Sequence, residues 1–351
     1  MPRATKRIRS VLTLVALLLS TVYPSPSQSL PADLRSTLAD TFHFTPDQLK
    51  RMERGEPVAR LLTGDSPDDL QLIGVVLIKQ RPEEFIRAYK DIAHFEVARQ
   101  VRRTGKFSDP PKESDLEGFR VPDLNQKDLL ACGPGNCAYK LSASVMEDLK
   151  KNVDWSAPDA EERANLRVRK LWIEYLNQYQ RRGDRALAVY DDTPRSFPVA
   201  AGLKQLIGDA TVVEARDPEL IRYLQEYPDC RPPNTEDFFY WQEAAFGLKP
   251  VVRASHVTIQ KLPQPGGAHY LVASKMLFAT HYFRAAIEFK YLYPVRTTSG
   301  QPAFYFVSYQ RSFVDGMTGF TGAILRRIVP GRTQASLIEN LQLAKQRLEG
   351  N

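Results

Sequence analysis

The chain has 351 residues, 43% of them hydrophobic and 10% aromatic, so it is long and apolar enough to bury a sizeable core. Its formal net charge of +7 is largely due to its first residues, where four basic side chains have no acidic counterpart. Without them, 44 basic residues face 41 acidic ones, and the resulting charge of +3 argues against a nucleic-acid-binding domain.

The N-terminal residues have the pattern of an export signal. Four basic side chains within the first nine residues precede the apolar run 11–22, and a stretch rich in Pro and Ser follows up to Ser29. The apolar run is shorter than the roughly 20 residues that span a bilayer, which disfavours a permanent anchor. We therefore expect residues 1–29 to be a cleaved signal peptide and the mature protein to be periplasmic or secreted.

The segment 30–71 is predicted to be an N-terminal helical segment. Thr45 has the pattern of a helix N-cap, followed by Pro46 at the first helical position and Gln48 at the third. Gly55 is a typical terminator, so we expect a helix over residues 46–54.

A strand and a helix are predicted to follow directly. The β-branched run 72–79 predicts a short strand. Arg-Pro-Glu-Glu then opens an amphipathic helix, whose apolar positions are Phe85, Ile86, Tyr89 and Ile92.

The region from about 96 to 249 is predicted to be a mostly helical insertion. The charged, Pro-containing stretch 104–128 is typical of a loop. The longest predicted helix begins near Ser156 and ends at about Arg182, because apolar residues recur every three or four positions and Gly183 follows.

Two of the three cysteines enclose the turn Cys132-Gly-Pro-Gly-Asn-Cys137. In an oxidising compartment this spacing favours a disulfide between Cys132 and Cys137. A metal site would need two further ligands at suitable spacing, and the four intervening residues differ from a thioredoxin-like motif, so we expect no metal. Cys230 could be a buried free thiol or could replace one member of the pair.

The periodicity changes from helical to strand-like after Pro250. Four strands are expected at residues 251–261, 269–279, 283–291 and 303–312. The last segment, 333–348, is predicted to be an amphipathic helix with Leu337, Leu341, Ala344 and Leu348 on one stripe.

This order of elements resembles that of the START-like, or SRPBCC, helix-grip proteins. The segment 76–92, Val-Leu-Ile-Lys-Gln-Arg-Pro-Glu-Glu-Phe-Ile-Arg-Ala-Tyr-Lys-Asp-Ile, looks like their opening strand and helix. The resemblance covers residues 72–95 and 250–349. The chain is also similar to exported bacterial proteins with a Cys-containing loop and an Ala-Ser-Lys to His-Tyr-Phe stretch, a likeness that implies no activity.

The START-like resemblance implies an α+β fold in which a curved antiparallel sheet grips a long C-terminal helix and encloses an apolar cavity for lipids, sterols or polyketides. We accordingly expect residues 72–349 to form one START-like domain. The insertion of about 150 residues between the first helix and the main strands departs from the family pattern.

The strand 283–291 is predicted to line this cavity. Apolar residues alternate there with charged ones, which would direct one set inward and Glu288 and Lys290 to water. If the alternation continues backward, His281 faces the same interior. The predicted ligand-binding residues are therefore His281, Phe283, Ile287, Phe289 and Tyr291.

His281 could act as a general acid or base, orient a ligand, or be a hydrogen-bonded core residue. Ser274 and Lys275 are adjacent on a predicted strand and so point to opposite faces. No serine-hydrolase motif occurs, and we assign no catalytic residue and no cofactor.

The leading hypothesis is a cell-envelope protein that binds an apolar or amphipathic, lipid-like molecule between its sheet and its last helix. Peripheral contact with a membrane is compatible with this hypothesis. One alternative is a cyclase- or hydrolase-like enzyme that uses His281. Another is an envelope scaffold that recognises a protein through an exposed apolar patch on the helical insertion.

Overall fold

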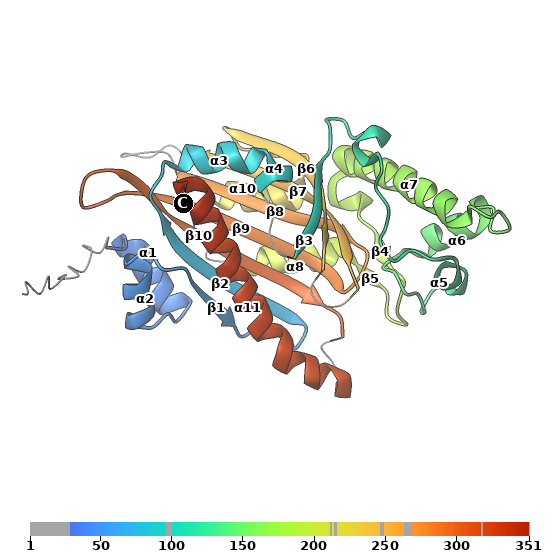
Figure 1. The fold of residues 1–351 in the computed structure, drawn as a ribbon, viewed down its shortest axis with the longest axis horizontal. Helices are drawn as coiled ribbons and strands as arrows, with labels where there is room; N and C mark the ends of the chain where they lie inside the picture. Colours follow the sequence, from blue (N-terminus) through green and yellow to red (C-terminus); the bar gives the residue numbers. More distant parts are fainter. Residues whose placement is uncertain are drawn as a thin grey trace, which may run out of the picture.

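The computed structural model describes residues 29–95, 100–210, 213, 216–245, 249–262, 269–316 and 319–350. The predicted signal peptide, apart from Ser29, lies outside these residues. The fold is α+β, with a large antiparallel sheet and helices on both of its faces (Figure 1).

The sheet has eight strands in the spatial order β1-β2-β10-β9-β8-β7-β6-β3. Strands β6 to β10 follow one another as hairpins, and β2 pairs antiparallel with β10. The strands are β1 (Val58–Leu62), β2 (Asp69–Ile78), β3 (Val101–Lys106), β6 (Thr235–Ala244), β7 (Val251–Leu262), β8 (His269–Ala279), β9 (Phe283–Arg296) and β10 (Pro302–Val314); β4 (Val189–Tyr190) and β5 (Phe197–Pro198) form a separate pair.

The five strands predicted from the sequence are present, but the other three strands of the large sheet and the short pair β4 and β5 were not expected. β1 lies in the segment predicted to be helical, and β3 and β6 lie in the predicted helical insertion. β6 is buried on both faces along most of its length, so its sequence lacks the alternation that marks a half-exposed strand.

The helices include the predicted ones, with changes at their ends. They are α1 (Ala32–Ser36), the π-helical turn η1 (Thr37–Thr41), α2 (Pro46–Glu53), α3 (Pro82–Lys90), α4 (Ile92–Phe95), the 3₁₀ turn η2 (Glu113–Leu116), α5 (Gln126–Ala131), α6 (Ala143–Asn152), α7 (Ala160–Arg182), the 3₁₀ turn η3 (Gly183–Ala186), α8 (Val199–Gly208), α10 (Pro218–Glu226) and α11 (Gly319–Glu349). α2 has the predicted capping box: the backbone N–H of Gln48 donates to the Thr45 hydroxyl, and that of Thr45 donates to the Gln48 side chain. α11 begins 14 residues before the predicted start.

One face of the sheet, here called the α11 face, is covered by α3 and α11. Leu337 and Leu341 of α11 and Phe85 of α3 share a core with Phe306 of β10 and Leu292 of β9. A Cβ atom on Gly74 of β2 would lie 2.7 Å from Leu341 Cδ1, so glycine permits the close approach of α11. The C-terminal helix therefore crosses the sheet in a helix-grip-like arrangement (Figure 1).

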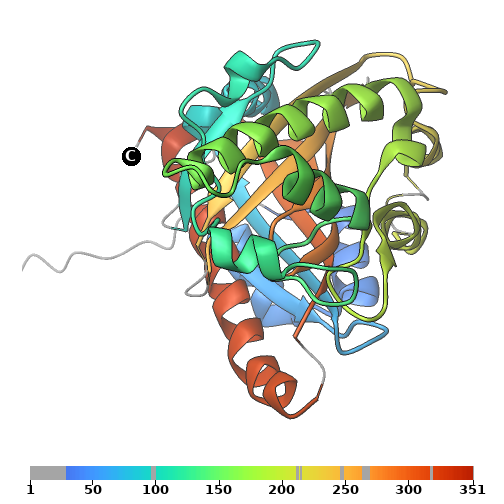
Figure 2. The ribbon, with the colours of Figure 1, turned by 90° about the vertical axis from the view of Figure 1, so that its right-hand side faces the viewer.

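The other face, here called the α8 face, is covered by α8, α10, α7 and the N-terminal helices. Leu203 of α8 and Leu38 of η1 share a core with Ile73 of β2 and Phe289 of β9. Figure 2 shows α11 in red and the N-terminal helices in blue on opposite sides of the sheet. The division into a segment 30–71 and a domain 72–349 stays a prediction, but the helices of 30–71 share the core of the sheet.

None of the described helices is both long and apolar enough to cross a membrane.

Candidate functional site

The predicted ligand-binding strand does not face the C-terminal helix. Ile287 and Phe289 are buried on the α8 face, where α8 packs against β9. α11 lies on the opposite face, together with Leu292 of the same strand. The prediction that these two residues line a cavity under the last helix is therefore wrong. Helices cover both faces of the sheet, and the alternation within one strand does not reveal which helix covers which face.

Glu288 and Lys290 are not directed to water either. Lys290 is buried, forms an ion pair with Glu288, and lies with its Nζ 5.1 Å from the centre of the Tyr89 ring of α3. Ser308 Oγ and Gln310 Nε2 donate to Glu288 Oε1 at 2.8 and 3.0 Å. Burial raises the pKa of Glu288, but the charge of Lys290 and these hydrogen bonds lower it by more, so the net shift is downward.

His281 does not continue the alternation of β9. The strand begins at Phe283, and Tyr282 has a left-handed φ of 59°, so the chain turns between the two residues. Phe283 packs instead beside a small cluster that contains Met276 and Val251. The prediction that His281 and Phe283 share an interior with Ile287 is thus not met.

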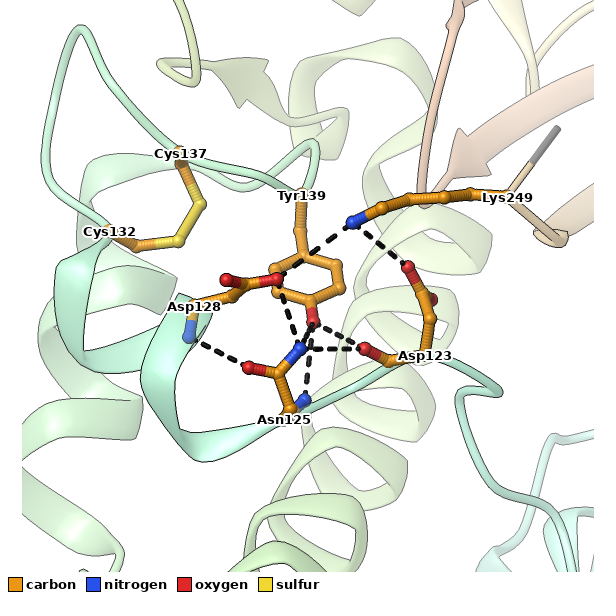
Figure 3. The surroundings of a disulfide bond; sticks show 7 residues. All are labelled: Asp123, Asn125, Asp128, Cys132, Cys137, Tyr139 and Lys249. Carbon is orange, nitrogen blue, oxygen red and sulfur yellow. Dashed lines mark hydrogen bonds and ion pairs between the residues drawn. A yellow bond between two sulfur atoms is a disulfide. The ribbon is translucent and has the colours of Figure 1, made fainter.

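The His281 side chain contacts a polar cluster beside the cysteine loop. Its Nε2 lies 2.9 Å from Asp123 Oδ2, and its ring centre lies 5.3 Å from that of Tyr139. Tyr139 Oη donates to the Asp123 carbonyl at 2.7 Å, and Lys249 Nζ approaches Asp123 Oδ2 at 3.4 Å (Figure 3). Burial raises the pKa of Asp123, but the contacts with His281 and Lys249 lower it by more.

The cysteine loop is closed as its spacing predicts. Cys132 and Cys137 form a disulfide, and Gly133 and Asn136 bridge across the turn between them (Figure 3). Cys137 N donates to the Asp192 carbonyl at 2.9 Å, which attaches the loop to the chain after β4. Cys230 is free and exposed rather than buried, because it lies on the surface turn after α10.

The pair His281 and Asp123 is enclosed. His281 is only 5% exposed and lines neither of the two cavities described below. A general base must reach the proton that it removes from a substrate. The described contacts of His281 and Asp123 therefore link the segments beside the cysteine loop to the turn between β8 and β9.

A second buried polar cluster surrounds His256 and connects helices to the sheet. His256 of β7 is 1% exposed; its Nδ1 lies 3.1 Å from Tyr179 Oη of α7 and its Nε2 lies 3.0 Å from Asp237 of β6. Tyr223 of α10 donates to the same carboxylate at 2.7 Å. These contacts tie the helices of the insertion to the sheet.

A cavity lies on the α8 face, near the β1 edge of the sheet. It measures about 380 Å³, within the range of roughly 300 to 1,000 Å³ that is typical of small-molecule sites. The sheet supplies its floor and the turn after η1 and the end of α8 supply its walls; the lining includes Thr41, Phe42, His43, Arg60, Leu62, Gln71, Asp209, Ala210 and Tyr309.

Local backbone geometry produces the wall at η1. His43 has a left-handed φ of 54°, which reverses the chain so that Phe42 and Phe44 on either side are both buried. Phe42 thereby reaches the sheet, where its ring centre lies 5.5 Å from that of Tyr309.

An ion cluster holds the wall at the end of α8. Arg311 of β10 is 3% exposed and binds Asp69 at 2.8 Å, Asp65 at 2.8 Å and Asp209 at 3.0 Å. Burial lowers the pKa of this guanidinium, but Asp69 raises it by more, so Arg311 remains protonated. Asp209, which follows α8, is thus fixed at the cavity.

A smaller, apolar recess adjoins the cavity. It measures about 30 Å³, room for about one water molecule, and it shares Phe42 and Tyr309 with the larger cavity. Tyr291, one of the predicted ligand-binding residues, lines this recess. Its buried hydroxyl has no hydrogen-bond partner among the described residues, and burial raises its pKa.

Sequence reasoning missed most of this site. Phe42 and Arg60 lie far from Tyr309 in the chain, and the pairing of β1 with β2 and of β2 with β10 brings Arg60 and Tyr309 into one sheet. Of these residues, Tyr309 has a sequence pattern that places its side chain: it alternates with Val307 and Tyr305 on one face of a predicted strand.

Comparison of the sequence with models of known families and with curated proteins gives no match. Among solved structures, the chain has a weak likeness to the di-domain aromatase/cyclase StfQ from the steffimycin biosynthetic pathway. The identity is 13%, the likeness covers 87% of this chain and 93% of that chain, and the TM-score is 0.22. A TM-score this low carries no argument about function, so the START-like resemblance stays a prediction.

Proposed function

We propose that this chain is an exported protein that binds a small amphipathic molecule in the cavity of about 380 Å³ on the α8 face. The observation that carries the proposal is the composition of its lining. Polar side chains such as Arg60, Gln71 and Asp209 meet apolar ones such as Leu62 and Phe42, and an apolar recess adjoins them. A molecule with one polar end and one apolar end matches the polar and the apolar side chains of this lining.

The proposal keeps the ligand class expected from the sequence and changes the location. The predicted site lay between the sheet and the C-terminal helix, whereas this cavity lies across the sheet from α11. Export rests on the N-terminal sequence pattern, and the Cys132–Cys137 disulfide suits an oxidising compartment.

The two alternative functions have less support. An enzyme acting through His281 would need that side chain to reach a substrate, and it is enclosed. In the described part of the insertion, the exposed large hydrophobic side chains are Leu130, Leu166 and Val189. Single exposed apolar residues are normal on a protein surface and do not indicate a partner.

The test is to block the cavity and measure binding by isothermal titration calorimetry with octanoate and 1-octanol, both small amphiphiles. Leu62→Trp enlarges a side chain that lines the cavity and is expected to weaken binding of both probes by at least roughly tenfold. Leu130→Trp adds the same bulk at an exposed position on α5 and should bind like the parent protein. Organic extraction of the purified protein, followed by mass spectrometry, would identify a natural ligand.

Two results would overturn the proposal. The first is a parent protein that carries no extractable ligand and binds neither probe. The second is binding that persists unchanged in Leu62→Trp.

A further inference from the structure

Among the described residues that line the cavity, Arg60 is the arginine, and none of its contacts with a described carboxylate is an ion pair. It lies on β1 opposite Ile73 of β2, so its side chain is on the α8 face with Val58 and Leu62. Its Nε is buried and has no hydrogen-bond partner in the described part of the chain. No described carboxylate forms an ion pair with it, whereas Arg311 nearby is bound by three aspartates.

A guanidinium that lines a cavity and has no described carboxylate partner can bind an anion there. Arginine cannot lose its proton in a protein, and a buried donor without a partner costs free energy. Its planar group presents two parallel N–H donors, which match the two oxygens of a carboxylate. The partly buried position of Arg60 in the cavity wall would strengthen such a contact relative to one in water.

The charges beside the cavity restrict the anion further. Asp65, Asp69 and Asp209 outnumber Arg311, which they bind. A second negative charge on the ligand would add repulsion from this acidic excess, so the surrounding charges favour a ligand with one negative charge. The apolar part of the ligand would contact the side chains of Leu62, Phe42 and Tyr309.

We propose that the ligand is a monoanionic amphiphile, a carboxylate with an apolar portion, whose carboxylate is held by Arg60. This inference rests on the proposed binding function and names its substrate class. It also assigns Arg60 a role in binding and none in stability, because no described carboxylate forms an ion pair with it.

The experiment compares three probes with the same alkyl chain: octanoate, 1-octanol, and octyl phosphate at mildly alkaline pH, where it is a dianion. The parent protein should bind octanoate most tightly, and added salt should weaken that binding. Arg60→Gln should lower octanoate affinity by roughly tenfold to a hundredfold and leave 1-octanol unchanged, since one charge-assisted contact is lost. Arg102→Gln changes an exposed arginine on β3, at the other edge of the sheet, and should bind like the parent.

The melting temperatures of Arg60→Gln and Arg60→Met distinguish a loss of ligand binding from a loss of stability. Both variants should melt at or above the parent temperature. A marked fall would show that Arg60 has a structural role and would overturn its assignment to the ligand.

The outcomes separate the two proposals. If octanoate affinity is unchanged in Arg60→Gln while Leu62→Trp abolishes binding, the carboxylate assignment is wrong and the cavity still binds amphiphiles. Tighter binding of octyl phosphate than of octanoate would likewise contradict a monoanion. If the parent binds none of the three probes, the proposed function itself fails.

Discussion

Arg60, which lines the cavity, and Arg311, which binds Asp209 in its wall, illustrate how the role of a charged residue follows from its partners. Arg311 is held by three aspartates, so its donors are used within the fold. Arg60 lies on the same face of the sheet, and its buried Nε has no described partner. Arg311 therefore fixes the shape of the site, and Arg60 is available to a ligand.

Residue-level reasoning from the sequence succeeded where the determinants were local. The spacing of Cys132 and Cys137 within a Gly-containing turn predicted their pairing. The pattern of Thr45 followed by Pro46 and Gln48 predicted the capping box of α2. The surroundings of Arg60 depend on chain segments more than a hundred residues away, and no local pattern encodes them.

Burial of His256 predicts a pH dependence of stability. Burial lowers the pKa of His256, and Asp237 only partly offsets this effect, so its folded-state pKa lies below the ordinary value near 6.5. Above about pH 6.5 the residue is neutral in both states. As the pH falls below that value, the unfolded chain takes up a proton that the folded protein does not, and stability decreases.

We expect the free energy of unfolding to fall by up to about 1.4 kcal/mol per pH unit below pH 6.5 through this one residue. His256→Gln should show a smaller slope in urea denaturation at several pH values between about 5 and 7.5. Part of the slope should remain, because burial also lowers the pKa of His269. Identical pH profiles for parent and variant would show that His256 is not responsible.

At the scale of elements, the sequence predicted the positions of most strands in the chain, but not which helices pack against each face of those strands. Residues 251–312 alternate strongly enough to define β7 to β10, but β1 is short and β6 is buried on both faces. β9 shows the limit of the pattern: Ile287 and Lys290 point to opposite faces and both are buried. The sequence pattern separates the two faces of a strand and does not state which helix covers each.

The packing of α8 on β9 provides an element-scale prediction. A Cβ on Gly202 would lie 2.4 Å from Phe197 Cζ and 3.1 Å from Ala285 Cβ, whereas a Cβ on Gly208 would meet its nearest neighbour at 3.9 Å. Gly202→Ala should therefore destabilise the protein by about 1–3 kcal/mol through overpacking. Gly208→Ala, in the same helix, should be neutral or stabilise by up to about 1 kcal/mol.

Urea denaturation of the two glycine variants measures both effects. Equal destabilisation would mean that the glycines matter for backbone conformation alone. No effect at Gly202 would mean that α8 does not approach β9 as closely as described.

At the scale of the whole molecule, the sheet separates two environments. The α11 face carries the long C-terminal helix expected from the sequence, together with the Glu288 and Lys290 pair. The α8 face carries the N-terminal helices and the cavity. The fold class was therefore predictable from the order of elements, whereas the site was not, because it arises where residues 30–71 and the end of α8 meet the sheet.

The central claim is that a small amphiphile binds on the α8 face, and the most direct measurement is a crystal structure with bound 8-bromooctanoate, located by the anomalous signal of bromine. We predict electron density for the carboxylate at Arg60 and a bromine peak among Leu62, Phe42 and Tyr309. A bromine peak between α11 and the sheet, beside Leu337 and Phe306, would contradict the account and restore the location expected from the sequence.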